Sequence, residues 1–271
     1  LSLHDALPIY EARTGGLIVA AIVAAGLTAM ALTGNYTYFG TSSATLPFGP
    51  GWIAVPVIGA LGGLAGGGFA RIVILFARGL PGRLGAAIAA RPVAFAAACG
   101  LGVALCGLAS GGTVYGTGYE EARALLHAGN DPRWDFAPLK FLATVLSSIS
   151  GIPGGLFAPS LAVGAGLGAE ASLFLPDVPV GALVLIGMTA YLTGALQAPI
   201  TAFVIVTEMT QDHALMIPLM VAALIADAVS KAVCREGLYH ALAHILLERA
   251  GTEARPAGPA PPGHAAQNSR A

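Results

Sequence analysis

The chain has 271 residues, of which 56% are hydrophobic and only 10% are charged. Soluble domains usually carry about 25% charged residues, so this composition argues for a membrane protein. The net charge of −1 gives no electrostatic support for a nucleic-acid partner.

The amino-terminal stretch LSLHDALPI begins with Leu rather than Met. It resembles a translated sequencing-adaptor scar, so we expect residues 1–10 to be a non-native start of the chain. The stretch lacks the basic region, compact apolar core and cleavage site of a signal peptide.

Long apolar runs in the first half of the chain predict membrane-spanning helices, each of which needs about 20 mostly apolar residues. The candidates are 15–32, 52–77 and 91–108. The second run carries Gly59, Gly63 and Gly67 at intervals of four residues. This spacing lets two helices approach closely, so we expect these glycines to pack against another helix.

The second half of the chain has shorter apolar runs, several of them too short to cross a bilayer. They cover 136–149, 156–175, 180–196, 199–209, 214–233 and 238–248. Gly and Pro interrupt them, most densely at GIPGG (151–155). Non-helical backbone at membrane depth is tolerated only where it is buried in protein or lines a wet cavity. We therefore predict an all-α, polytopic membrane domain over 11–249 with tilted, broken and re-entrant helices, followed by a disordered tail over 250–271.

Basic residues gather at two places along the chain. The members are Arg71, Arg78, Arg83 and Arg91, and then Lys231, Arg235, Arg249 and Arg255. The positive-inside rule predicts that both groups lie on the cytoplasmic side of the membrane.

The break at GIPGG is followed by a helix-like run that begins LFAPSLAVG and has no charged side chain nearby. A helix start leaves backbone N–H groups unpaired and carries roughly half a positive charge. It can therefore bind an anion without a basic residue, and glycine lets the ligand approach the backbone closely. Such binding is weak enough for release, as conduction requires. The alternative is a helix kink that only helps packing.

The sequence SGIPGGLFAPSLAVGAGLGA (150–169) is similar to the signature SG-x-PGG-x-FAP-x-LA-x-G of the CLC family of voltage-gated chloride channels and chloride/proton exchangers. Three further stretches match this family in the same order. They are SGGTVYGTGYEEARALL (110–126), the segment 188–233 that begins MTAYLTGALQAP, and GLYHALA (237–243). The resemblance covers about 11–248 and corresponds to the second of two inverted repeats. We therefore expect an amino-terminally truncated member that lacks the first repeat, with its pore serine and gating glutamate.

The resemblance implies an anion site in which the backbone N–H groups of Leu156, Phe157 and Ala158 coordinate the anion. Gly155 is the residue of close approach, and the hydroxyl of Tyr239 is a further ligand. A phenol can donate such a hydrogen bond while it stays uncharged.

The resemblance also implies chloride transport, as a channel or a chloride/proton antiporter, rather than enzymatic activity, and no cofactor. The working unit would be a homodimer with helices of 199–233 at its interface, in a bacterial-type inner (plasma) membrane. The fragment alone is expected to be inactive, because half of each pore wall is missing. The alternatives are an unrelated secondary transporter that uses the same broken-helix device for a small anionic substrate, and an intramembrane enzyme.

Other polar and reactive residues receive no transport role. We expect Glu208 to be structural, and Glu170 and Asp227 to be paired without an assigned function. His240 and His244 share a helix face but lack a metal-binding pattern, so no metal site is predicted. The three cysteines are expected to be small buried apolar residues.

Overall fold

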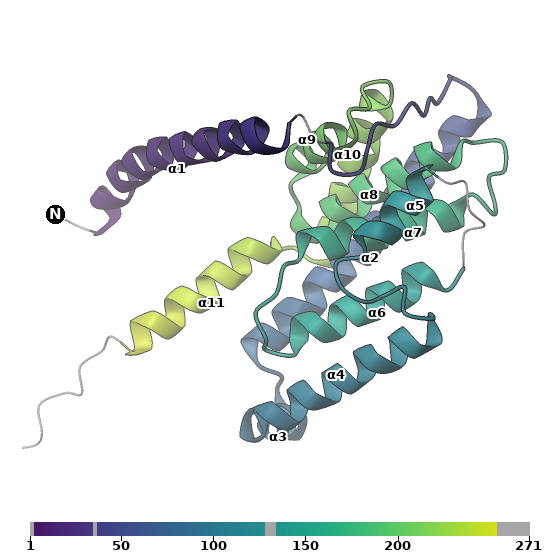
Figure 1. Ribbon diagram of the computed structural model, residues 1–271. Helices are drawn as coiled ribbons and strands as arrows, with labels where there is room; N and C mark the ends of the chain where they lie inside the picture. The colour runs from purple at the N-terminus through teal and green to yellow at the C-terminus, as the bar shows by residue number, and fades with distance from the viewer. Residues whose placement is uncertain (1–2, 35–36, 128–133, 254–271) are drawn as a thin grey trace, which may run out of the picture.

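The computed structural model describes residues 3–34, 37–127 and 134–253, and in these ranges every regular element is helical (Figure 1). The predicted all-α class is therefore confirmed. In chain order the α-helices are α1 (Leu3–Thr33), α2 (Ala54–Arg78), α3 (Gly82–Ala90), α4 (Pro92–Ala109), α5 (Tyr119–His127), α6 (Phe136–Ile149), α7 (Phe157–Ala171), α8 (Val180–Leu196), α9 (Pro199–Thr210), α10 (Met216–Val233) and α11 (Leu238–Glu253). A short 3-10 turn, Pro50–Ile53, leads into α2.

Four helical segments are long and apolar enough to cross a membrane by length and composition: Gly15–Thr33, Pro50–Arg78, Pro92–Ala109 and Met216–Val233. Helices α6, α8 and α9 are apolar but shorter. This mixture of full-length and short apolar helices agrees with the predicted membrane architecture.

Several elements differ from the sequence-based predictions. Helix α1 begins at Leu3 rather than at residue 15, and α7 ends at Ala171 rather than at residue 175. The short helix α3 was not predicted, because its Ala- and Gly-rich sequence is too brief to read as a membrane span. Helix α11 continues to Glu253, so residues 250–253 are helical rather than part of a disordered tail. The rest of that predicted tail lies outside the described residues, and the proposed non-native start at 1–10 remains a prediction.

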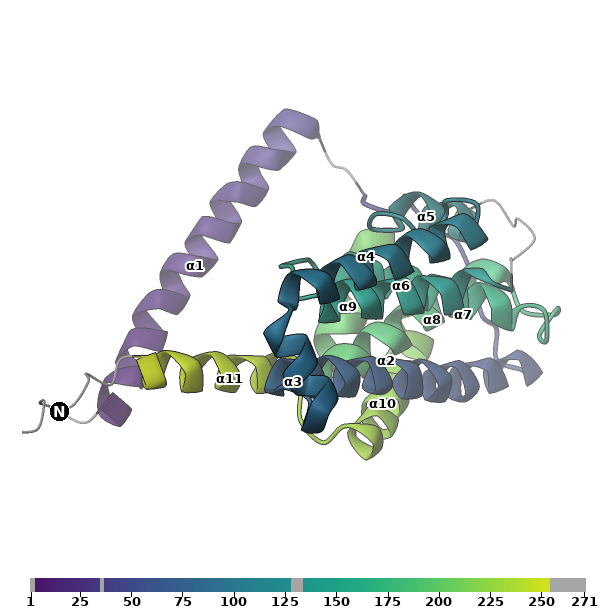
Figure 2. The same cartoon turned by 90° about the horizontal axis from the view of Figure 1, so that it is seen from below.

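Helix α8 forms the centre of the fold. Every residue from Ala182 to Leu196 is buried, as expected for a helix that is apolar all round. Its neighbours include α7, α2 and α10, which pack closely against it. Figure 2 shows the same bundle from below, with α2 lying alongside α10.

Helix α2 carries glycines on two faces, and each face receives a different helix. A Cβ added at Gly63 would lie 2.5 Å from the carbonyl oxygen of Ala226 in α10. One added at Gly66 would lie 2.5 Å from the backbone nitrogen of Ala195 in α8. The predicted packing role of the Gly59–Gly63–Gly67 face is confirmed, and the second face, which includes Gly62 and Gly66, extends it.

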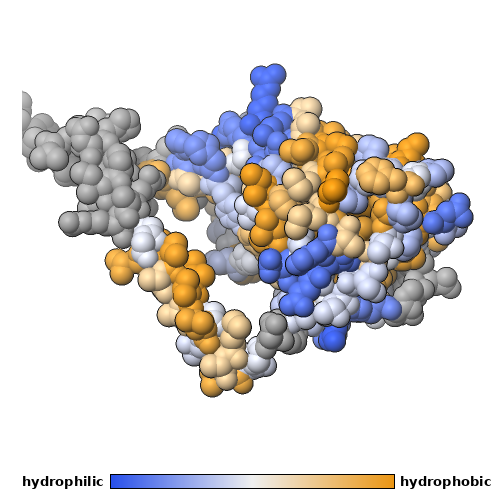
Figure 3. Space-filling model, turned by 90° about the horizontal axis from the view of Figure 1, so that it is seen from above, coloured by the Kyte–Doolittle hydropathy of each residue, from blue (hydrophilic) through white to orange (hydrophobic). Residues whose placement is uncertain are grey.

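Helices α1 and α11 extend away from the rest of the bundle (Figures 1 and 2). The membrane-length part of α1 is exposed along its whole length, including Leu17, Ile22 and Leu27. Hydrophobic side chains also reach the surface over much of the face seen in Figure 3. Exposed apolar surface of this extent fits contact with lipid or with other protein segments.

Candidate anion-binding site

The break between α6 and α7 is built by local hydrogen bonds and by glycine. The Ser150 hydroxyl donates to the carbonyl oxygen of Ser147 at 2.7 Å and accepts from the N–H of Ile152 at 3.2 Å. Gly151 has φ of +83°, a conformation that other residues rarely adopt. The chain then runs through Pro153, Gly154 and Gly155 to the first residue of α7, Phe157. The predicted broken helix is therefore present.

The start of α7 leaves a group of backbone donors open. Among the described residues, no hydrogen-bond acceptor pairs with the N–H groups of Gly155, Leu156, Phe157 or Ala158. Pro159 follows in the first turn and has no N–H group, so it leaves no additional donor there. No side chain caps the helix. This is the arrangement that favours an anion at a helix start.

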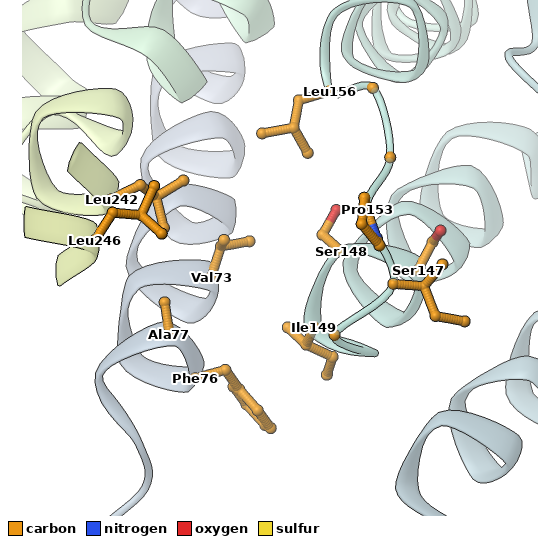
Figure 4. Close-up of a pocket in the computed structure, with 14 residues that line it drawn as sticks. Val73, Phe76, Ala77, Ser147, Ser148, Ile149, Pro153, Leu156, Leu242 and Leu246 are labelled. Carbon is orange, nitrogen blue, oxygen red and sulfur yellow. The ribbon is translucent and has the colours of Figure 1, made fainter. Parts of the chain in front are cut away.

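The same loop lines a cavity of about 550 Å³ (Figure 4). One wall comes from Val73, Phe76 and Ala77 of α2, and another from Leu242 and Leu246 of α11. The opposite wall is the end of α6 together with residues 151–156 of the loop. Apart from Ser147 and Ser148, the polar groups that the lining residues offer are those of the backbone. The cavity thus presents backbone dipoles within apolar walls.

The predicted site residues are placed differently with respect to this cavity. Gly155 and Leu156 line it, whereas Phe157, which is 37% exposed, and Ala158 follow in the first turn of α7. Tyr239 is 49% exposed and does not belong to the lining. It does share a helix face with Leu242 and Leu246, at three- and seven-residue spacing. Four of the five predicted site residues, 155–158, thus lie in one segment at the start of α7. The fifth, Tyr239, lies on α11, which forms another wall of the cavity.

A buried lysine lies beside this segment and was missed by sequence reasoning. Lys140 of α6 is 1% exposed, and its ammonium group donates to the carbonyl oxygens of Val114 and Gly116, both at 2.9 Å. It lines a second cavity, of about 200 Å³, together with Tyr115, Thr144, Ser147, Ser148, Gly155 and Pro159. Gly155 and the two serines thus lie between the two cavities. The available signal was a charge in an apolar run, which marks a functional-site hypothesis.

Lys140 holds the Gly-rich loop 110–118 against α6, so its replacement should loosen that loop. We expect Lys140→Met to lower the free energy of unfolding by about 2–4 kcal/mol, because two carbonyl groups lose their donor. Lys140→Arg keeps a buried cation that can donate to both and should cost clearly less. Thermal unfolding in detergent measures the difference, and equal stability of Lys140→Met and the wild type would contradict this role.

Two other polar residues find partners that the sequence did not specify. Glu170 accepts from the N–H of Ala137 at 2.9 Å and so caps the start of α6. Asp227 pairs with Lys231 one turn later, at 2.6 Å. Asp227 is therefore in an ion pair, whereas the partner of Glu170 is a backbone N–H group. The three cysteines are buried, as predicted.

Gln197 lies between two helices. It ends α8 in a left-handed conformation, with φ of 56°, and it stands two residues before α9 begins at Pro199. Its side-chain amide donates to the carbonyl oxygen of Cys234 at 2.6 Å, beyond the end of α10. Gln197 therefore fastens the end of α8 to the end of α10.

Comparisons with known proteins all point to the same family. Residues 6–231 match the family model described as "Voltage gated chloride channel". The H(+)/Cl(-) exchange transporter ClcA of Vibrio vulnificus (strain YJ016) is 36% identical over 111 residues, which are 39% of this chain and 24% of that protein. The chloride channel protein CLC-f of Arabidopsis thaliana is 29% identical over 235 residues, which are 76% of this chain and 29% of that protein. The chain thus spans about a quarter of the length of these relatives.

Solved structures share the fold at low sequence identity. The crystal structure of a CLC-type fluoride/proton antiporter matches with a TM-score of 0.62 and 21% identity, over 77% of this chain and 51% of that one. A slow cyanobacterial Cl−/H+ antiporter matches with a TM-score of 0.54 and 22% identity, over 79% and 50%. Since the family model covers most of the sequence, the chain belongs to the voltage gated chloride channel family.

Proposed function

We propose that this chain forms one half of a chloride pathway through a membrane, in which the start of α7 binds the passing anion. The supporting observation is the set of open N–H donors at 155–158, in a segment that lines a 550 Å³ cavity. The lining of this cavity includes no charged side chain, so an anion held by its backbone donors can be bound and released quickly. The pathway would serve a channel or a chloride/proton antiporter, and relatives with both names are similar to this chain.

Tyr239 completes the site in this proposal. It lies on α11, the helix that forms one wall of the cavity, and it shares its helix face with two residues of that wall. These two residues are Leu242 and Leu246, and their side chains line the cavity (Figure 4).

Removing the Tyr239 hydroxyl tests this assignment. Tyr239→Phe should weaken anion binding by about tenfold or more, because a hydrogen bond to a charged group contributes about 1.5–3 kcal/mol. The measurement is chloride calorimetry on the complete protein that carries this sequence. Unchanged affinity would remove Tyr239 from the site, whereas the backbone site at α7 would stand.

The assembly that we propose is a homodimer in a bacterial-type inner membrane. Helices α9 and α10 offer an apolar outer surface for it, with Ile200, Ile217 and Leu224 each more than 60% exposed. Lipid could cover the same surface. Crosslinking of a cysteine placed at Ile217 in the membrane separates these two, because only a dimer brings two copies of the residue together.

The chain by itself should not carry anions. Its donors at α7 form one side of the proposed pathway, and the apolar surface of α1 lacks a partner among the described residues. We expect chloride efflux from liposomes that contain only these 271 residues to equal that of empty liposomes. Efflux clearly above that baseline would contradict the proposal that a second half is required.

The family membership argues against the two alternatives. An unrelated secondary transporter would not match a family model over 6–231. The matched family is one of chloride channels and transporters, which gives no support to an intramembrane enzyme.

A further inference from the structure

A third cavity, on another face of α2 from the 550 Å³ cavity, has a different chemical character. It has a volume of about 310 Å³ and lies where α2 ends and α10 passes into α11. Its lining comprises Arg71, Ile74, Leu75, Arg78, Val233, Cys234, Arg235 and Glu236. We refer to it as the arginine pocket. The arginine pocket shares no lining residue with either cavity beside α7.

The charge of the arginine pocket is positive. Arg78 donates to Glu236, so this pair is internally neutral, whereas Arg71 and Arg235 remain as exposed cations. The carboxyl ends of α2 and α10 each contribute about half a negative charge nearby. Three guanidinium groups outweigh one carboxylate and these two partial charges. The pocket can therefore attract a negatively charged group, and guanidinium matches phosphate oxygens with paired N–H donors.

The walls of the arginine pocket are apolar on the side that faces the helices. Ile74 and Leu75 come from the last turns of α2, and Val233 is the last residue of α10. Both helices are long and apolar enough to cross a membrane by length and composition, so we place their ends at the membrane surface. The pocket thus joins a basic rim to an apolar wall at the depth where phospholipid headgroups meet acyl chains.

The side of the membrane on which the arginine pocket is expected also favours binding of an anionic phospholipid. Arg71, Arg78 and Arg235 belong to the two basic groups that the positive-inside rule places at the cytoplasmic surface. Anionic lipids are attracted to basic residues at this surface by about 1 kcal/mol per residue, and basic pockets between helices bind their headgroups. We propose that the arginine pocket binds the phosphate group of an anionic phospholipid, with an acyl chain against Ile74, Leu75 and Val233.

Binding of a fluorescent phosphatidylglycerol to the purified chain in neutral detergent tests this proposal, with unlabelled lipids as competitors. We expect unlabelled phosphatidylglycerol to compete well and phosphatidylcholine to compete poorly. The double variant Arg71→Ala/Arg235→Ala should bind about 30-fold more weakly, from about fivefold per arginine. Arg91→Ala is the matched control, because it removes an exposed arginine outside the pocket, at the start of α4, and should change affinity less than twofold.

Glu236→Gln is expected to strengthen lipid binding, and a misfolded protein would not show such a gain. The substitution releases Arg78 from its ion pair and removes a negative charge, so binding should become several-fold tighter. Equal losses in Arg91→Ala and in the double variant would overturn the proposal, as would unchanged or weaker binding in Glu236→Gln. Competition by inorganic phosphate as effective as that by phosphatidylglycerol would also overturn it, because a soluble phosphate would then be the ligand.

The proposed lipid site and the proposed anion pathway can be tested independently of each other. Gly155→Asp, which alters the start of α7, should leave phosphatidylglycerol binding unchanged. The double arginine variant should likewise leave anion binding at α7 unchanged.

Discussion

Replacement of Gly155 by Asp is expected to abolish anion binding at the start of α7. A Cβ at Gly155 meets no atom within 4 Å, so the side chain can be accommodated without displacing the loop. Gly155 lines both cavities beside α7. The carboxylate of an aspartate at this position would therefore lie next to the open N–H groups of residues 156–158. A fixed negative charge there would neutralise the helix start and compete for the same donors as chloride.

Gly155→Asn is the matched control for this effect, because it has the same shape without the charge. We expect chloride binding by Gly155→Asp to be at least about tenfold weaker than by Gly155→Asn, which corresponds to about 1.4 kcal/mol. Chloride calorimetry measures both variants, with thermal unfolding to show that each is folded. Equal affinities in the two variants would mean that the start of α7 does not contact the anion.

Replacement of Gly66 by Ala is expected to destabilise the fold strongly. The added Cβ would lie 2.5 Å from the nitrogen of Ala195 and 2.6 Å from the carbonyl oxygen of Tyr191. Both atoms belong to the backbone of α8, so relief requires α2 and α8 to move apart. Overpacking of this kind typically costs about 1–3 kcal/mol.

Gly68→Ala is the control in the same helix, two residues away. A Cβ at Gly68 meets no atom within 4 Å, so the change should be neutral or stabilising by up to about 1 kcal/mol through helix propensity. Unfolding temperatures of both variants in detergent give the comparison. A Gly66→Ala protein as stable as Gly68→Ala would contradict the close packing of α2 on α8.

The helices of the second half could be predicted closely from the sequence. The predicted runs 136–149 and 180–196 coincide with α6 and α8. Both are apolar runs bounded by polar residues, Gly or Pro, and these local signals decide where a helix starts and stops. The start of α7 after GIPGG was predictable for the same reason.

The contacts between helices could not be predicted in the same way. The sequence shows that Lys140 lies in an apolar run, but its two carbonyl partners, Val114 and Gly116, come from a loop more than 20 residues earlier. Likewise, the four-residue glycine spacing predicts one packing face of α2, whereas the face at Gly62 and Gly66 depends on where α8 lies. Tertiary contacts of this kind follow from the fold rather than from local sequence patterns.

The most direct test of the anion site is anomalous diffraction from crystals of the protein soaked in bromide, which replaces chloride and can be located without ambiguity. We expect a bromide beside the backbone nitrogens of Leu156, Phe157 and Ala158, and its loss in Gly155→Asp. Bromide found only elsewhere, for example at Arg71 and Arg235, with none at the start of α7, would contradict the claim that this helix start is the anion site.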